Sequence, residues 1–71
     1  MTGNELLRRL RKLGKERGVA VRIDEIRGKG SHAVLYYGLR QTTLKDRRKE
    51  IGTGLLRTML RQLGLSLRDL E

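Results

Sequence analysis

The spacing of apolar residues changes twice along this chain, and these changes constrain its fold most strongly. Leucines recur at helical intervals in residues 6–13, with basic residues between them. Residues 19–26 switch to a period of two, which predicts a strand with one buried face. A second helical stripe of leucine and methionine follows in residues 55–63. With 71 residues in all, these segments are expected to form one small domain, residues 1–71, around a thin core.

Capping residues indicate where the helices begin and end. Residues 2–5 (TGNE) form a capping box, in which the threonine hydroxyl accepts a hydrogen bond from the third helical amide and the glutamate reaches back. Gly18 suits the left-handed cap of this first helix. Thr53 is the expected N-cap of the second helix and Gly64 its C-cap. Ser66 is the expected cap of one last turn.

Two further strands are predicted between the helices. Glycines 28 and 30 mark a loop, residues 33–37 and 41–44 have strand composition, and residues 45–50 form a charged connector. The predicted order is α-β-β-β-α, an α+β fold with a three-stranded antiparallel sheet. Because such a sheet cannot bury an apolar face alone, both helices should pack on one side of it. This layout resembles double-stranded-RNA-binding (dsRBD-like) domains, a likeness that does not by itself give a function.

The balance of charge points to a polyanionic partner. Seventeen Lys and Arg residues stand against eight Asp and Glu residues, which gives a formal net charge of +9. Residues 1–18 and residues 19–52 each carry +4, whereas residues 53–71 carry +1. Phosphate backbones are the commonest partners of such chains. Many small basic domains, however, merely bind ribosomal or nucleoid surfaces.

Several classes of protein are disfavoured. The chain has no cysteine, hence no disulfide framework and no cysteine-based metal site. A single histidine without a carboxylate cluster argues against a zinc site. The N-terminus lacks the apolar segment of a signal peptide, and no apolar run approaches the roughly 18 residues of a membrane span. These features favour the cytoplasm and give no reason to expect membrane contact.

Residues 28–38 (GKGSHAVLYYG) hold the only histidine and both aromatic residues. The two glycines permit close approach of the backbone to a phosphate, the lysine between them adds positive charge, and the serine supplies a hydroxyl. Imidazole is the side chain that most readily exchanges protons at neutral pH, which makes His32 a candidate general base. A lone histidine at the start of a strand is otherwise an ordinary surface or half-buried residue.

Two other features leave alternatives open. Tyr36 and Tyr37 point to opposite sides of their strand, so one enters the core and the other faces the open side of the sheet. The open-face tyrosine either packs locally or stacks on a base, and packing is favoured. Residues 45–49 carry four basic side chains, which form either a solvated connector or a phosphate contact beside the N-terminus of a helix.

Several of these motifs together resemble one known family. A leucine-rich first helix is followed by residues 28–32 (GKGSH), which open the second strand. Residues 49–51 (KEI) precede residues 54–64 (GLLRTMLRQLG), with "LRQLGL" near the end of the chain. The glycine–serine–histidine motif is short, but its combination with this order of elements is specific. Over nearly its whole length the chain resembles the HicA family of toxins.

The resemblance implies a dsRBD-like fold and the activity of an mRNA interferase from a bacterial toxin–antitoxin pair. Such a toxin cleaves RNA through the motif histidine, here His32, and is blocked by a HicB antitoxin. The free toxin is compatible with a monomer. The predicted RNA-binding residues are Arg27, Lys29, Gly30, Ser31, Lys45, Arg47, Arg48 and Lys49.

Two departures from the family pattern affect this interpretation. Many members have a second histidine directly after the first, where this chain has Ala33. The proline often found before the second helix is missing from residues 51–54. His32 is therefore the sole imidazole available to act on a ribose 2′-hydroxyl, with Lys29 stabilising the phosphate.

This scheme needs no metal and no other cofactor. The acid that protonates the leaving oxygen stays open between water, a lysine and His32 itself in a later step. A non-catalytic RNA- or nucleoid-binding module shares the same charge and fold and is the main alternative. A structural interaction protein that uses the open sheet face is a third.

Overall fold

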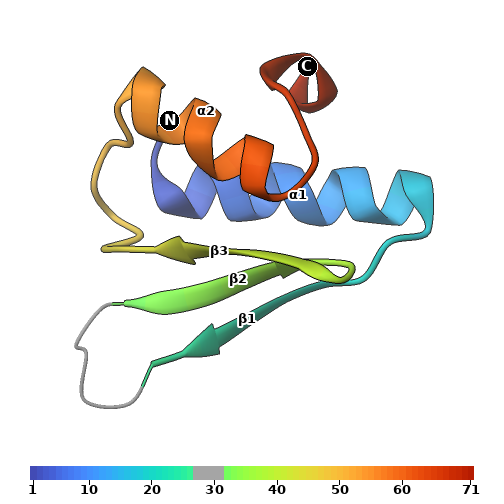
Figure 1. Ribbon diagram of the computed structural model, residues 1–71, viewed down its shortest axis with the longest axis horizontal. Coiled ribbons are helices and arrows are strands. Elements are labelled where there is room, and N and C mark those ends of the chain that lie inside the picture. Colours follow the sequence, from blue (N-terminus) through green and yellow to red (C-terminus); the bar gives the residue numbers. More distant parts are fainter. Residues whose placement is uncertain (27–31) are drawn as a thin grey trace.

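Two helices and a three-stranded sheet form this chain, with a short 3-10 turn at its end (Figure 1). The computed structural model describes residues 1–26 and 32–71. The elements are α1 (Gly3–Arg17), β1 (Val21–Glu25), β2 (Ala33–Tyr37), β3 (Arg40–Leu44), α2 (Thr53–Gln62) and η1 (Leu67–Leu70). The predicted α-β-β-β-α order is confirmed.

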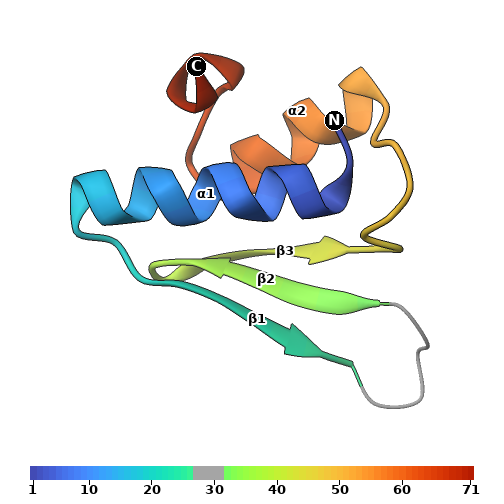
Figure 2. The ribbon, with the colours of Figure 1, turned by 180° about the vertical axis from the view of Figure 1, so that it is seen from behind.

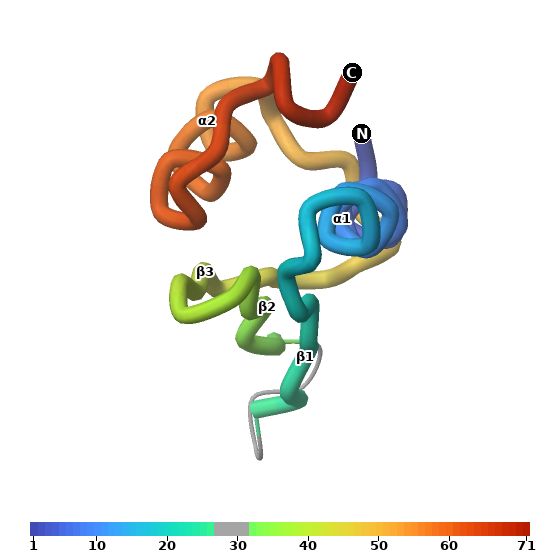
Figure 3. The backbone as a smooth tube through the Cα atoms, turned by 90° about the vertical axis from the view of Figure 1, so that its right-hand side faces the viewer, coloured from blue at the N-terminus to red at the C-terminus, as the bar shows by residue number. Residues whose placement is uncertain are grey.

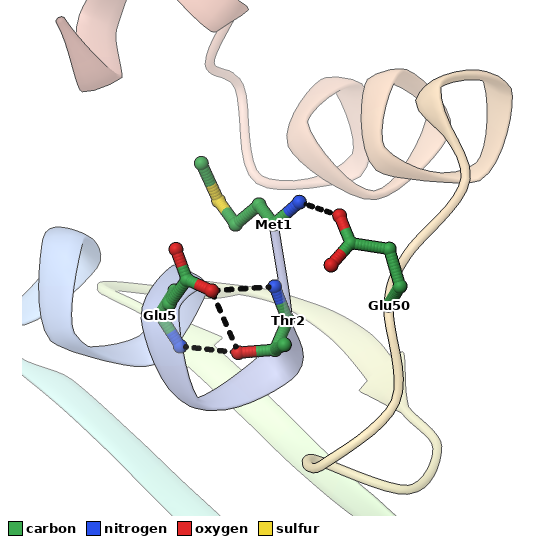
Figure 4. A network of polar contacts seen from close by, with 4 residues as sticks. All are labelled: Met1, Thr2, Glu5 and Glu50. Atoms are coloured by element: carbon green, nitrogen blue, oxygen red, sulfur yellow. Dashed lines mark hydrogen bonds and ion pairs between the residues drawn. The ribbon is translucent and has the colours of Figure 1, made fainter.

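The N-terminus of α1 is capped as the sequence predicts. The Glu5 amide donates to the Thr2 hydroxyl at 3.2 Å, and the Thr2 amide donates to the Glu5 carboxylate at 3.3 Å. These bonds lower the pKa of Glu5, chiefly through the Thr2 backbone amide. Figure 4 shows this capping box beside an ion pair between the terminal amine of Met1 and Glu50. At the other end, Gly18 ends the helix with a φ of 69°.

The three strands form an antiparallel meander in the order β1-β2-β3. Val21 pairs with Tyr37 at one end of the first ladder, and Glu25 pairs with Ala33 at the other. A tight turn at Gly38, with a φ of 62°, joins β2 to β3. Only two residues are needed for this turn, so β3 begins at Arg40, one residue earlier than predicted.

The first strand is shorter than the predicted residues 19–26. The Val19 amide donates to the Gly14 carbonyl at 2.8 Å, so this residue completes the end of α1 instead of joining the sheet. The Ala20 carbonyl accepts a hydrogen bond from the Gly38 amide at 2.8 Å, beyond the last residue of β2. The hydrogen bond that completes the end of α1 therefore excludes Val19 from the strand that its sequence pattern predicts.

Both helices lie on the same face of the sheet, as predicted, and no described element covers the other face (Figure 3). Leucines from α1, one face of the sheet and the apolar stripe of α2 meet between these layers, and Val21 and Ile23 of β1 pack against them while partly buried. The buried cluster consists of Leu6, Leu7, Leu10, Leu13, Leu35, Tyr37, Leu44, Leu56, Met59, Leu60, Leu63 and Leu70.

The ends of α2 correct one prediction and refine another. Gly52, not Thr53, is the N-cap; it has no side chain to cap with, and its carbonyl accepts a hydrogen bond from the Leu56 amide at 2.9 Å. Thr53 is instead the first helical residue. The left-handed residue expected at Gly64 is found there, with a φ of 76°, one position after the C-cap Leu63.

The C-terminal turn is fastened to α1 by polar contacts. Ser66 caps η1 as predicted: its amide donates to the Asp69 carboxylate at 2.8 Å. The Arg17 guanidinium lies 2.7 Å from the same carboxylate and lowers the pKa of Asp69, with the Ser66 amide as the second cause. Because the folded chain favours the ionised form of Asp69, this contact stabilises the fold at neutral pH. That stabilisation is lost as the pH falls through the lowered pKa of Asp69.

None of the helices in the described part of the chain is both long and apolar enough to cross a membrane.

Gly14 lies where α1 contacts the start of β1, and a larger residue does not fit there. A Cβ atom at position 14 would lie 2.5 Å from the Val19 carbonyl oxygen and 2.8 Å from a Val21 methyl group. Alanine favours a helix interior by about 1 kcal/mol over glycine. We nevertheless expect Gly14→Ala to lower the free energy of unfolding by about 1–3 kcal/mol, because a backbone atom cannot yield cheaply.

The matched control is Gly54→Ala in α2, where nothing lies within 4 Å of the added Cβ atom. This variant should gain up to about 1 kcal/mol from helix propensity. Urea denaturation followed by circular dichroism measures both. A Gly14→Ala protein as stable as the Gly54→Ala protein would contradict the close approach of α1 and β1.

Candidate functional site

His32 lies directly before β2, at the end of the sheet that also holds the connector between β3 and α2 (Figure 1). Its carbonyl oxygen accepts a hydrogen bond from the Ile26 amide at 3.1 Å, which continues the β1–β2 register. Within β2, Ala33 and Leu35 are fully buried against the helices. Strand alternation therefore directs the half-buried His32 to the opposite, open face.

Four predicted RNA-binding residues precede this histidine in the chain. Arg27, Lys29, Gly30 and Ser31 lie outside the described residues. Their roles stay predictions.

Lys45 lies at the same end of the sheet as His32. The β2–β3 ladder ends with the pair Ala33–Leu44, so His32 directly precedes that pair on β2 and Lys45 directly follows it on β3. Leu44 is buried, whereas Lys45, the first residue after β3, is exposed. With Lys49, it also borders a hollow of about 200 Å³ between the end of β3, the connector and α2, which Leu55 and Met59 line from the helix. The end of the sheet thus combines an imidazole with an ammonium group.

Arg47 has partners on the helix side of the structure. Its guanidinium lies 2.6 Å from the carboxylate of Glu25, at the end of β1. Its carbonyl oxygen accepts a hydrogen bond from the Asn4 amide at 2.9 Å, in the first turn of α1. A Cβ atom added at Gly3 would lie 2.8 Å from the Arg47 Cα atom. Arg47 therefore joins the connector to both α1 and β1. Figure 2 shows this connector, between β3 and α2, beside the N-terminal end of α1.

Arg48 and Lys49 lie on a turn organised by Asp46. The Arg48 amide donates to the Asp46 carboxylate at 3.1 Å, and the Lys49 amide donates to the Asp46 carbonyl at 3.1 Å. The Arg48 side chain is 86% exposed, with its Nε atom 3.6 Å from the same carboxylate. Of the four predicted connector residues, Lys45, Arg48 and Lys49 are thus exposed to a ligand, and Arg47 is engaged with the fold.

The open sheet face also holds a group that was not predicted as a site. The Arg22 guanidinium carbon lies 4.2 Å from the centroid of the Tyr36 ring, and its Nη1 atom lies 2.6 Å from the Asp24 carboxylate. Arg22 and Asp24 alternate with the apolar Val21 and Ile23 in the sequence. This alternation could have placed them on the open face, but only the strand register reveals Tyr36 as their neighbour.

The two tyrosines divide as the sequence predicts. Tyr37 is 8% exposed and belongs to the core, whereas Tyr36 is half-buried and faces the open side.

In the parts of the chain that the structure describes, no three His, Cys, Asp or Glu side chains gather as metal ligands.

Comparison with known proteins agrees with this arrangement. A family model described as the HicA toxin of bacterial toxin–antitoxin systems matches residues 3–65, which include α1, the whole sheet and α2. The chain belongs to the HicA toxin family. No curated protein and no solved structure matched it. Family membership makes this chain a toxin of a toxin–antitoxin system, and it confirms the resemblance found in the sequence.

The residue that replaces the second histidine of many HicA toxins lies on the other side of the sheet. Ala33 is fully buried beneath the helices, whereas strand alternation directs His32 to the open face. A side chain at position 33 therefore does not stand beside the imidazole. The absence of a second histidine leaves the open face unchanged.

Proposed function

We propose that this HicA toxin is an endoribonuclease that cleaves RNA with His32 and is neutralised by a HicB-like antitoxin. The observation that carries the proposal is the position of His32 directly before β2, at the same end of the sheet as the exposed Lys45 that follows β3. An imidazole beside a cation is suited to act on a phosphodiester, because the first moves a proton and the second stabilises negative charge.

In the proposed reaction, His32 takes the proton of a ribose 2′-hydroxyl. The 2′-oxygen then forms a bond to the adjacent phosphorus, and the bond from phosphorus to the 5′-oxygen breaks. Lys45 and the predicted Lys29 stabilise the charge that develops on the phosphoryl oxygens. The leaving 5′-oxygen takes its proton from water, from a lysine such as Lys45, or from His32 in a later step. All atoms are supplied by the RNA, the protein and water.

Substrate RNA would be held through its phosphates. Lys45, Arg48 and Lys49 are exposed on the connector, next to the sheet end that holds His32. Arg27, Lys29, Gly30 and Ser31 are predicted to extend this surface. Arg47 contributes mainly by fixing the connector, because its guanidinium is already paired with Glu25.

Replacing His32 tests the reaction. We expect His32→Ala to reduce cleavage of a labelled mRNA by about 10²- to 10⁴-fold, the usual contribution of general acid–base catalysis. Cleavage by the unchanged protein should survive EDTA. Thr58→Ala, a change at an exposed position of α2 on the covered side of the sheet, is the matched control and should retain activity.

Circular dichroism of both variants separates loss of chemistry from loss of fold. A folded His32→Ala protein with full activity would exclude the imidazole mechanism. RNA binding without cleavage by the unchanged protein would favour the non-catalytic binding module.

The salt dependence of RNA binding tests the phosphate contacts. If about four basic side chains contact single-stranded phosphates, the logarithm of affinity should fall with the logarithm of salt concentration at a slope of roughly −3. Arg48→Gln should reduce this slope by about 0.7. Arg57→Gln, an exposed arginine of α2, removes the same charge away from the sheet and should leave the slope unchanged. Equal effects of the two variants would show that only net charge matters.

A HicB-like antitoxin should neutralise this toxin by covering His32. The helices are engaged in the core, so the open sheet face and the connector remain available to a partner. An acidic partner would be attracted over long range by the net charge of +9. We expect hydrogen exchange to slow around residues 24–34 in the complex, and Lys29 and His32 to lose solvent exposure.

Charge reversal on the connector should slow association of the antitoxin. We expect Arg48→Glu to reduce the association rate at low salt, while Arg48→Lys retains it. Arg47→Glu is the less informative change, since it would set two carboxylates side by side at Glu25. Protection confined to the surfaces of α1 and α2 would contradict inhibition by direct cover.

A further inference from the structure

On the open face of the sheet, two flat side chains are stacked. Arg22 and Tyr36 are directly opposite each other in the β1–β2 ladder, and the guanidinium carbon lies 4.2 Å from the centre of the phenol ring. Asp24, two residues along β1, holds the Arg22 Nη1 atom at 2.6 Å. The guanidinium thus contacts both an aromatic ring and a carboxylate.

This stacked pair is open to a ligand. The Arg22 side chain is 61% exposed although it lies over a ring. On the other side of Tyr36, the β2–β3 register sets the exposed Gln41, which offers both a donor and an acceptor. The row across the sheet therefore consists of a guanidinium, a ring and an amide, without an aliphatic side chain among them.

The chemistry of this row selects a nucleobase more than a phosphate. Asp24 pairs with Arg22, so the two charges offset each other and attract a phosphate less than the exposed cations of the connector do. The guanidinium of Arg22 and the ring of Tyr36 nevertheless offer flat surfaces to a ligand. Bases in single-stranded RNA stack on aromatic rings and on guanidinium planes. An ion pair on a bare surface would contribute little to stability, so stability gives no strong reason for its presence.

The row also has a fixed place relative to the proposed catalytic residue. His32 lies directly before β2 and Tyr36 lies within it, and strand alternation sets both on the same face, four residues apart, which is about 13 Å along a strand. Val34 lies between them on that face. When the phosphate to be cleaved lies at His32, the two nucleotides that flank it would therefore not reach the row. The base that reaches the row would belong to a nucleotide further along the RNA.

We propose that Arg22 and Tyr36 form a stacking platform for one base of single-stranded RNA, away from the cleaved phosphate. This inference rests on the proposed ribonuclease function, and it names a determinant of substrate binding and of the choice of cleavage site.

Binding to a non-cleaving protein tests the platform separately from the reaction. In a His32→Ala background, we measure affinity for a labelled single-stranded RNA of about eight nucleotides. Tyr36→Leu should weaken binding by about 5- to 150-fold, the range measured for loss of one base–aromatic stack. The slope of affinity against salt should stay unchanged, because no charge is removed. Tyr36→Phe keeps the ring and is the matched control that should bind normally.

Two more measurements distinguish stacking from a structural role of Tyr36. Arg22→Lys keeps the positive charge but replaces the planar guanidinium with an ammonium group, so it should also weaken RNA binding. An RNA that lacks the base at the platform position should bind the protein with an intact platform as weakly as intact RNA binds the Tyr36→Leu protein. Binding of the abasic RNA to the Tyr36→Leu protein should be no weaker still. Circular dichroism verifies that each variant is folded.

Normal RNA binding by folded Tyr36→Leu would overturn the proposal. So would loss of antitoxin binding alone, since that would assign the row to the protein partner. If the platform variants weaken binding but the unchanged protein never cleaves RNA, the platform stands and the proposed ribonuclease activity fails. In a cleaving protein, Tyr36→Leu should also alter which positions of an mRNA are cut.

Discussion

Leu6, Leu10 and Leu60 are completely buried between two helices and one face of a three-stranded sheet. In a chain of this length, two short helices supply enough apolar surface to cover only one face of the sheet. The other face must then remain in water, which explains why β1 alternates between the apolar Val21 and Ile23 and the charged Arg22 and Asp24. The open face on which we place the catalytic residue follows directly from this one-sided core.

Hydrogen bonds between distant segments turn this open face into a defined surface. The connector after β3 is attached to the beginning of the chain, because the Asn4 amide bonds to Arg47 and the Ile51 amide bonds to Met1 at 2.8 Å. A bridge between Thr2 and Glu50 completes this junction. As a result, these contacts hold the basic connector residues beside the sheet end where His32 lies.

Local signals allowed much of this fold to be predicted. The leucine spacing, the capping box and the period-two segments each depend on neighbouring residues, so the sequence shows them directly. Errors arose where two local preferences met, as at Val19, whose amide completes a helix instead of a strand. Thr53 has a side chain that suits an N-cap, but the helix begins at that residue and Gly52 takes the cap.

The candidate site could be predicted only in part, for a related reason. His32 stands out as the sole imidazole, and the basic connector is visible as a run of charge. The partner of Arg47, in contrast, is Glu25, 22 residues earlier, and no sequence pattern links the two. The contact between Arg22 and Tyr36 likewise depends on the register of two strands joined by a loop.

The order of the strands has a consequence for the chain at high concentration. Because β1 and β3 are both edges, each presents unpaired backbone groups that a second chain could use to extend the sheet. Both strands are only five residues long, β1 carries three charged residues, and β3 begins with an arginine. Short, charged edges oppose the addition of a foreign strand. A protein with so thin a core is thereby protected against aggregation through its own sheet.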